Sequence, residues 1–394
     1  MNNLYDVVII GGGIHGVGVA QAAAAQGYSV LVLEQTALAF GASSRSSKLI
    51  HGGLRYLESF QFSLVKECLA ERELLLKLAP DLVRLVPFYI PLYESTQRQA
   101  WQLRAGLSMY SLLARFSSAS RFSTVPRSRW QSLDGLDTQK LRSVFCYQDA
   151  QTDDASLTKA VMQSATSLGA EIQLPAQFIQ AQIGKDKVSI DYLLRDETHQ
   201  CQARVLVNAS GAWVNQTLDR VTPQIDKRKI DLVQGTHILV PGALTSGIYY
   251  MEVPEDHRAV FAMPRGDATL VGTTEKPFSG DPAKVEASVE EQTYLMKVLA
   301  HYFPHYREEE NQIILSCFAG LRVLPKAEGR AFDRSRETLL IPNQKHQARL
   351  LSIYGGKLTT YRATAEKVMA RLESSLPQRK KQADTRQLPL TPAL

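Results

Sequence analysis

The chain has 394 residues, of which 44% are hydrophobic and 21% are charged, so it can bury a large core and has room for two closely joined domains. A net charge of only +6 gives no reason to expect nucleic acid as a partner, although it favours phosphorylated substrates or an anionic membrane surface. The cysteines, Cys68, Cys146, Cys201 and Cys317, are widely spaced, which predicts reduced thiols in a reducing compartment. The sequence has no metal-ligand spacing, so we expect no metal site.

The N-terminal segment predicts a βαβ unit. Residues 5–10 (YDVVII) form a short apolar run that is typical of a buried parallel strand. Helical spacing follows over residues 14–26, Gly27 stands where a helix C-terminal cap is expected, and residues 28–33 predict a second buried strand. This order of elements indicates a doubly wound α/β domain.

A glycine-rich turn joins the first strand to the helix. Gly11 permits the tight turn, Gly13 lets a pyrophosphate approach the backbone, and Gly16 lets the helix pack on the strand. The helix N-terminus offers N–H groups to phosphates, and Glu34 at the end of the second strand is placed to accept hydrogen bonds from ribose hydroxyls. This combination predicts a bound dinucleotide, but it does not separate FAD from NAD.

Two later segments favour a flavin. Residues 205–207 predict a strand that leads into the turn at 208–211 (NASG), and residues 350–354 predict a buried strand followed by Gly355, Gly356 and a helix. The positive end of that helix is placed where it would stabilise a reduced, anionic flavin ring. Together with the N-terminal unit, these segments predict FAD.

Two insertions separate the three cofactor-type segments, so the predicted domains are discontinuous. We predict a Rossmann-like FAD-binding domain and a substrate-capping domain built on a mixed sheet, which together give an α/β fold class. The FAD-binding domain comprises residues 1–80, 145–222 and 331–394, and the capping domain comprises 81–144 and 223–330. The tail from Pro377 is expected to be poorly ordered.

Four motifs carry a family resemblance. They are SSRSSKLIHGGLRYLE at Ser43–Glu58, AERE at Ala70–Glu73, GTH at Gly235–His237 and GGKLTTYR at Gly355–Arg362. Together they resemble the FAD-dependent glycerol-3-phosphate dehydrogenases over nearly the whole chain. The resemblance implies FAD, a two-domain fold, oxidation of sn-glycerol 3-phosphate to dihydroxyacetone phosphate, and electron delivery to membrane quinone. Family members typically continue as a helical C-terminal domain, whereas this chain stops near its beginning, so we expect effects on oligomerisation and membrane docking.

The resemblance also implies a substrate pocket, lined by Arg55, Tyr56, His237, Arg322 and Lys357. The chemistry agrees, because three cations from distant segments suit a phosphate dianion and arginine can bind it in a bidentate geometry. Arg55, His237, Arg322 and Lys357 are the predicted catalytic residues. His237 is the first candidate to accept the C2 hydroxyl proton while hydride leaves C2, and Lys357 or a water is the alternative base.

The same segments predict the contacts with FAD. They are Gly11, Gly13, Ile14, His15, Gly16, Glu34, Gln35, Ser43, Ser44, Ser47, Lys48, Leu49, His51, Gly52, Gly53, Phe178, Ala209, Ser210, Gly211, Trp213, Gly356, Lys357, Leu358 and Thr359. Within this set, His15 is expected mainly to pack inside the fold. His51 either contacts the flavin or only forms hydrogen bonds within its own loop.

Other functions remain open at this stage. One alternative is an FAD-dependent oxidase or dehydrogenase of another small hydroxy acid or amino acid, although such a site needs one arginine and not three cations. Oxygen in place of quinone would leave the motifs unchanged, and the chain could also be a partner-dependent FAD-binding subunit. Arg322 lies between Leu321 and Val323, where the family has Val before and Pro after the arginine, which admits a related substrate of different bulk or charge.

The basic, aromatic stretch from Arg98 to Arg129 predicts a membrane-facing surface, with Trp101, Tyr110 and Phe116 as its apolar contacts. The same aromatic positions would also suit a core. Because no leader or apolar span is visible, the predicted location is cytoplasmic and peripheral on the inner face of the cytoplasmic membrane. A homo-oligomer is compatible with the sequence.

Overall fold

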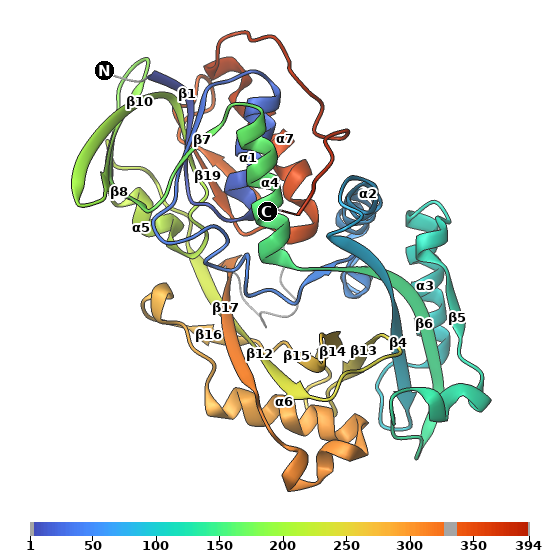
Figure 1. Cartoon of the computed structure of the whole chain (residues 1–394). Helices are drawn as coiled ribbons and strands as arrows, with labels where there is room; N and C mark the ends of the chain where they lie inside the picture. Colours follow the sequence, from blue (N-terminus) through green and yellow to red (C-terminus); the bar gives the residue numbers. More distant parts are fainter. Residues whose placement is uncertain (1–3, 327–336, 393–394) are drawn as a thin grey trace.

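The computed structural model describes residues 4–326 and 337–392, and two β-sheets at opposite ends of the molecule form its framework (Figure 1). Each sheet mixes parallel and antiparallel strand pairs, and helices pack beside both. This confirms the predicted α/β fold class, and both sheets are mixed. The expected domain boundary between residues 330 and 331 lies outside the described residues.

The first sheet is built around a parallel core. Its strands are β1 (Leu4–Ile10), β2 (Val30–Leu33), β7 (Glu171–Gln173), β8 (Ala176–Ile183), β9 (Val188–Leu194), β10 (Glu197–Asn208), β11 (Val221–Thr222), β18 (Leu339–Pro342) and β19 (Leu350–Tyr354). β1 pairs in parallel with β2 and β10, and β10 pairs in parallel with β19. β8 and β9 form an antiparallel hairpin beside β10. Strands β1, β2 and β19 are largely apolar, because both of their faces are covered.

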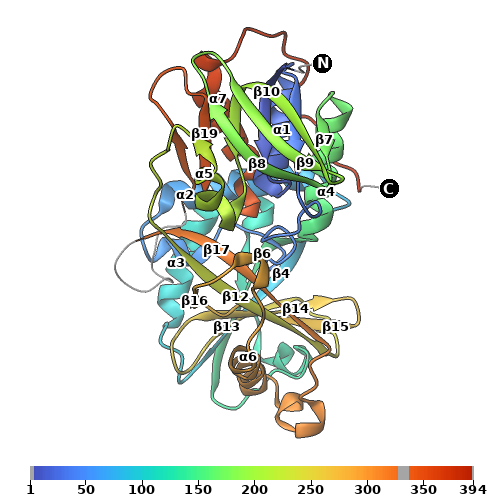
Figure 2. The same cartoon turned by 90° about the vertical axis from the view of Figure 1, so that its left-hand side faces the viewer.

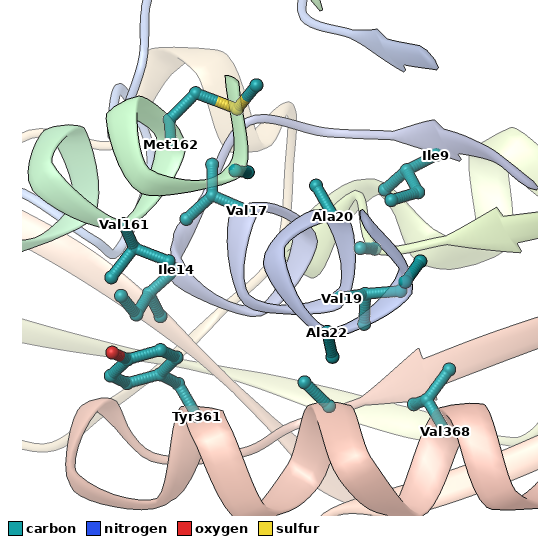
Figure 3. Packing of buried hydrophobic residues seen from close by; sticks show 14 of the residues in the cluster. Ile9, Ile14, Val17, Val19, Ala20, Ala22, Val161, Met162, Tyr361 and Val368 are labelled. Atoms are coloured by element: carbon teal, nitrogen blue, oxygen red, sulfur yellow. The ribbon is translucent and has the colours of Figure 1, made fainter. Parts of the chain in front are cut away.

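Three helices pack together beside this sheet, and α1 (Ile14–Ala25) lies between α4 (Asp154–Ser167) and α7 (Tyr361–Leu372) (Figure 3). Nearly every residue of α1 is buried, because its alanines, valines and glycines let the neighbours approach on all sides. A Cβ atom on Gly18 would lie 2.8 Å from the ring of Tyr361, so glycine is needed at this helix crossing. Within the described ranges, no helix combines the length and the hydropathy that a membrane span requires.

The second sheet is longer and more strongly antiparallel. Its strands are β3 (Leu49–Ile50), β4 (Val83–Tyr93), β5 (Phe122–Thr124), β6 (Leu141–Thr152), β12 (Ile230–Pro241), β13 (Ile248–Glu252), β14 (Ala259–Arg265), β15 (Ala268–Gly272), β16 (Lys276–Phe278) and β17 (Ser316–Pro325). Figure 2 shows α6 (Val289–Tyr302) beneath this sheet, with the first sheet above it. α2 (Phe62–Leu78) and α3 (Ala100–Leu113) lie beside β4 and β6, and the short helix α5 (Val214–Leu218) follows β10 (Figure 1).

One predicted domain boundary needs correction. Residue 145 was expected to begin a segment of the FAD-binding domain, but it lies inside β6, which belongs to the second sheet. β6 pairs with β4 from Leu141 to Thr152, with one register shift opposite Leu92 and Tyr93, and the ladder is regular across residue 145, so a domain boundary there would divide a paired strand. The short strand β3, from the expected first segment, also pairs with β6. The second sheet therefore takes residues from both sides of the predicted boundaries.

The C-terminal tail differs from its expected poor order. Arg379 forms an ion pair with Asp6 at 3.1 Å, and the N–H groups of Gln382 and Ala383 both donate to the carbonyl of Ala25. Leu390 is only 2% exposed and joins the core around α1. The tail packs beside the first sheet because Arg379 pairs with the buried carboxylate of Asp6 and two backbone N–H groups bond to the last carbonyl of α1.

Candidate active site

A cavity of about 690 Å³ lies between the carboxyl ends of the parallel strands and the inner face of the second sheet. Ligand sites of this size and position are typical of open α/β sheets. The walls come from the turn after β1, the loop after β2, the 3₁₀ helix η1 (Leu54–Leu57), strands β12 and β17, and the turn after β19. All three predicted cofactor segments contribute, together with the second insertion, residues 223–330.

The glycine-rich turn closes one end of this cavity. Gly11 has a φ of 107°, and a Cβ there would lie 2.7 Å from the carbonyl oxygen of Ala209. The Glu34 carboxylate accepts from the N–H groups of Gly12 and Thr36, both at 2.7 Å. Ser43 Oγ accepts from the N–H of Ile14, the first residue of α1, at 2.9 Å. The turn is thereby held open toward the cavity at the start of a helix, where N–H groups suit phosphate.

The turn after β19 forms a second part of the wall. Gly356 has a φ of 108°, and a Cβ there would overlap the ring of His15. The backbone of Gly356 therefore packs directly against this ring. Burial lowers the pKa of His15 to about 4, which leaves the imidazole neutral. His15 thus packs as predicted while it also lines the cavity. Thr359 Oγ1 accepts from the N–H of His51 at 3.2 Å, so this turn is tied to the segment of the first motif, Ser43–Glu58, which we call the motif loop.

His237 and Arg322 share one face of the second sheet. They lie on the paired strands β12 and β17, with the small residues Gly235 and Gly320 between them on the same face. A Cβ on Gly235 would lie 2.8 Å from Arg322 Nη2, so the absence of a side chain makes room for the guanidinium. Phe318 stacks on the His237 ring with centroids 4.9 Å apart.

The environment of His237 keeps its ring uncharged. The side chain is 1% exposed, and burial, assisted by the charges of Arg322 and Lys48, lowers its pKa to about 3. Nε2 lies 3.0 Å from Ser47 Oγ, and Nδ1 has no hydrogen-bond partner among the described residues. A neutral imidazole on the cavity wall is in the protonation state that a base requires.

Arg322 is held by polar groups of the loop after β15. Its Nη2 donates to Thr273 Oγ1 at 3.1 Å, and its Nη1 contacts Glu275 Oε1 at 3.2 Å and the carbonyl of Thr274 at 3.4 Å. Two of these partners, Thr273 and Glu275, also line the cavity. The guanidinium is therefore fixed in direction before any substrate binds.

Lys357 and Arg55 gather around the ring of Tyr56. Lys357 Nζ lies 3.6 Å from the ring centroid and Arg55 Cζ lies 5.1 Å from it, which are cation–π distances. Lys357 Nζ is also 3.9 Å from the Sγ of Cys68, and burial raises the pKa of that thiol to about 11, so the thiol stays neutral. Burial opposes charge on Arg55, but Tyr56 and Glu275 outweigh this effect and raise the pKa of Arg55. Two cations are thus concentrated at this part of the wall.

Known proteins are similar to this chain in sequence and in fold. The family model described as FAD dependent oxidoreductase matches residues 6–362. The glycerol-3-phosphate dehydrogenase of Pseudomonas aeruginosa is 40% identical over 377 residues, covering 94% of this chain and 72% of that protein. The chain belongs to the FAD-dependent glycerol-3-phosphate dehydrogenase family. The D-erythritol 1-phosphate dehydrogenase of Brucella abortus is 35% identical over 377 residues, covering 95% of this chain and 74% of that protein.

A solved structure of this family matches the fold. The glycerol-3-phosphate dehydrogenase from Bacillus halodurans, complexed with FAD, has a TM-score of 0.75 at 25% identity, covering 98% of this chain and 68% of that one. The chain is an FAD-dependent oxidoreductase, and the cavity fits this cofactor. Gly11 and Gly356 let their turns approach Ala209 and His15 where a side chain would clash, and the Glu34 carboxylate, a group suited to ribose hydroxyls, borders the cavity.

Most predicted site residues line this one cavity. For the cofactor these are Gly11, Gly13, Ile14, His15, Glu34, Gln35, Ser43, Ser47, Leu49, His51, Gly53, Phe178, Ala209, Ser210, Gly211, Trp213, Gly356, Lys357, Leu358 and Thr359. The predicted substrate residues Arg55, Tyr56, His237, Arg322 and Lys357 line it as well. Their individual contacts with FAD and substrate stay predictions.

Four predicted cofactor residues do not line the cavity. Gly16 packs against the backbone of Gly11, and Gly52 is covered by the hydroxyl of Tyr110, which accepts its N–H at 2.8 Å. Ser44 turns its hydroxyl toward carbonyl oxygens of its own loop. Lys48 is buried in an ion pair with Asp154. These residues support the motif loop, and the sequence pattern does not distinguish support from contact.

Several cavity residues were not predicted from sequence. Arg258, Thr273 and Glu275 lie on or beside strands β14 and β15 and face the same space as Arg322. No spacing or motif singles them out, because their positions depend on how β12, β15 and β17 pair across the sheet. Arg45 was also missed, although it lies inside a recognised motif and borders the cavity.

Proposed function

We propose that this enzyme oxidises sn-glycerol 3-phosphate to dihydroxyacetone phosphate. The observation that carries the proposal is the convergence of a neutral histidine and three cations from distant segments, His237, Arg55, Arg322 and Lys357, on one cavity wall. A phosphate dianion needs several positive donors, whereas a carboxylate needs one arginine. The names of relatives at 40% and 35% identity, a glycerol-3-phosphate dehydrogenase and a D-erythritol 1-phosphate dehydrogenase, support a polyol phosphate as substrate.

The side chains have distinct roles in this proposal. Lys357 and Arg55 bind the phosphate, because they are concentrated around Tyr56 and the neighbouring Cys68 thiol is uncharged. Arg322 binds the end of the substrate that lacks the phosphate and holds it near His237, because both side chains project from the same face of β12 and β17. His237 accepts the proton of the C2 hydroxyl. Bound FAD supplies the acceptor for the hydride that leaves C2.

Anaerobic mixing of the purified yellow protein with sn-glycerol 3-phosphate tests this function. We expect the visible flavin band to bleach with sn-glycerol 3-phosphate and to persist with glycerol or glycerate, because neither offers a phosphate group. D-erythritol 1-phosphate would measure how much chain length the pocket accepts. A band that dithionite bleaches but that no polyol phosphate changes would show that the substrate assignment is wrong.

We also propose that the electrons pass to membrane quinone and that the protein lies on the inner face of the cytoplasmic membrane. Support comes from α3 and the residues that follow it. Trp101 in α3 and Phe116 just beyond its end are each 70% exposed, and Arg104 and Arg115 are exposed nearby. Apolar side chains with flanking cations suit an anionic lipid surface. Tyr110 does not belong to this surface, because it is buried and donates to Asp149 at 2.6 Å.

Vesicle binding and quinone reduction test this part separately. We expect co-sedimentation with vesicles that contain phosphatidylglycerol, and weaker binding for Trp101→Ser combined with Phe116→Ser, while flavin bleaching by substrate stays normal. A short-chain quinone should reoxidise the reduced enzyme faster than oxygen does. If oxygen is the faster acceptor and the wild type does not co-sediment with the vesicles, the enzyme acts as an oxidase away from the membrane. If the double variant co-sediments as well as the wild type does, Trp101 and Phe116 do not form the membrane-binding surface.

A further inference from the structure

We propose that Glu275 selects substrates whose carbon end carries a hydroxyl group and rejects those that carry a carboxylate there. This inference rests on the proposed function, since it assumes a phosphate at the other end of the substrate. Glu275 lines the cavity, its side chain is 8% exposed, and its Oε1 lies 3.2 Å from Arg322 Nη1. Neither the motifs nor the family resemblance assigns this carboxylate a role.

The loop that carries Glu275 is held in place on several sides. The hydroxyl of Thr274 accepts the N–H of Thr236 at 2.8 Å and donates to the buried Glu291 carboxylate at 2.5 Å. The Glu275 carbonyl accepts from Arg258 Nη1 at 3.2 Å. With its backbone fixed in this way, Glu275 presents its carboxylate to the cavity in a defined position. Such preorganisation is what a group that discriminates between substrates requires.

The charges divide the predicted cation cluster into two parts. Around Tyr56, Lys357 and Arg55 concentrate positive charge. At the other part, Arg322 faces the negative charge of Glu275, and the nearby Arg258 pairs with Asp256 at 2.6 Å, so each cation at that end has a carboxylate partner. Arg55 senses the same carboxylate, because Glu275 helps to raise its pKa. The anionic group of a substrate is therefore favoured near Lys357, and the neutral end is favoured near Glu275.

The hydrogen-bonding capacity and charge of the Glu275 carboxylate limit which group the neutral end of the substrate can carry. An ionised carboxylate only accepts hydrogen bonds and offers about four acceptor positions, so it can bind a hydroxyl in addition to Arg322. A second carboxylate at the same place is repelled, and the repulsion is strong because the site is shielded from water. The substrate class that follows is a polyol phosphate with a free terminal hydroxyl, as opposed to a phosphorylated acid of equal length.

Two achiral ligands of equal length test the inference. Dihydroxyacetone phosphate and 3-phosphohydroxypyruvate differ only in a terminal hydroxymethyl or carboxylate group, and dissociation constants for the oxidised holoenzyme can be measured from changes in the visible flavin band. We expect wild type to prefer dihydroxyacetone phosphate. In Glu275→Gln the amide can donate to a carboxylate, so the preference should fall by about tenfold or more, which is about 1.4 kcal/mol.

Glu255→Gln is the matched control. It makes the same change in net charge at an exposed position, where Glu255 pairs with Lys297 at 2.6 Å, and it should leave the preference unchanged. Glu275→Asp retains the charge and should keep most of the selectivity, which also covers the case in which Glu275→Gln fails to fold. A preference that stays within about threefold of wild type in Glu275→Gln overturns the inference. If Glu275→Gln yields no holoenzyme, a Glu275→Asp variant that has lost the preference overturns it equally.

The same wild-type preparation separates this inference from the proposed function. If sn-glycerol 3-phosphate bleaches the flavin but Glu275→Gln keeps the wild-type preference, only the role of Glu275 is refuted. If sn-glycerol 3-phosphate does not bleach wild type, the proposed function fails and this inference fails with it.

Discussion

A substitution of Lys48 tests whether this residue contacts FAD or only holds the motif loop in place. The motif predicts that Lys48 contacts FAD, but its Nζ lies 2.5 Å from Asp154 Oδ1, and the two side chains are 6% and 0% exposed. Asp154 also accepts the N–H of Ser46 at 3.0 Å and its hydroxyl at 2.6 Å. The pair thus fastens the motif loop to the start of α4. Lys48→Met keeps most of the side-chain volume and removes the charge together with the hydrogen bond from Nζ to the carbonyl of Ser44.

The magnitude follows from the burial of both partners. Removing one partner of a buried ion pair leaves an uncompensated charge, which costs about 3–5 kcal/mol. In the double variant Lys48→Met with Asp154→Asn, no charge remains and an amide oxygen can still accept from Ser46. We therefore expect the double variant to be more stable than Lys48→Met alone, by about 1–3 kcal/mol.

Urea unfolding at saturating FAD, followed by tryptophan fluorescence, measures these differences. Lys297→Met is the control, because Lys297 is 72% exposed and its pair with Glu255 should contribute at most about 1 kcal/mol. We expect Lys48→Met to retain FAD under native conditions while unfolding at lower urea. If Lys48→Met unfolds like wild type but no longer retains FAD, the cofactor interpretation of Lys48 is right and the structural one is wrong.

Further predictions concern three residues of the cavity wall, His237, Gly356 and Gly235. His237→Ala should slow anaerobic flavin reduction by about 10²–10⁴-fold, and because the pKa of His237 lies near 3, the wild-type rate should show no loss from its protonation between pH 8 and 5. The pKa of His237 in the folded protein lies below its unfolded value of 6.5, so between these two values the unfolded chain binds more protons than the folded one. The folded state should therefore lose stability as pH falls from 6.5 toward 3. Urea unfolding midpoints measured across this pH range would show the loss. Gly356→Ala places a Cβ on the His15 ring at a φ of 108°, and it should weaken FAD retention in gel filtration, whereas Gly106→Ala, with nothing near its Cβ, should not. Gly235→Ala pushes on Arg322 and Thr273, so it should raise the KM for sn-glycerol 3-phosphate more than it lowers FAD content; equal losses would indicate misfolding.

Local features of the site could be predicted from the sequence alone. The turn at Gly11 and the second turn at Gly355 and Gly356 depend on backbone conformations that few residues other than glycine adopt, so the residue type itself predicts the conformation. The continuous apolar runs that become β1, β2 and β19 likewise predict strands covered on both faces. These segments therefore specify a dinucleotide-type α/β domain without reference to the rest of the chain.

The tertiary structure decided which charged residues face the cavity. Lys48 and Asp154 are 106 positions apart, and only the packing of α4 on the motif loop makes them an ion pair. Glu275 reaches Arg322 because β15 and β17 both pair with β12 in a fixed register, and a local pattern carries no information about that register. Charge and hydrogen-bonding capacity belong to a residue type, but burial and partners depend on contacts between distant segments. The cofactor turns and the fold class could therefore be predicted from residue types, whereas the packing of distant segments separates the groups that support the site from the groups that line it.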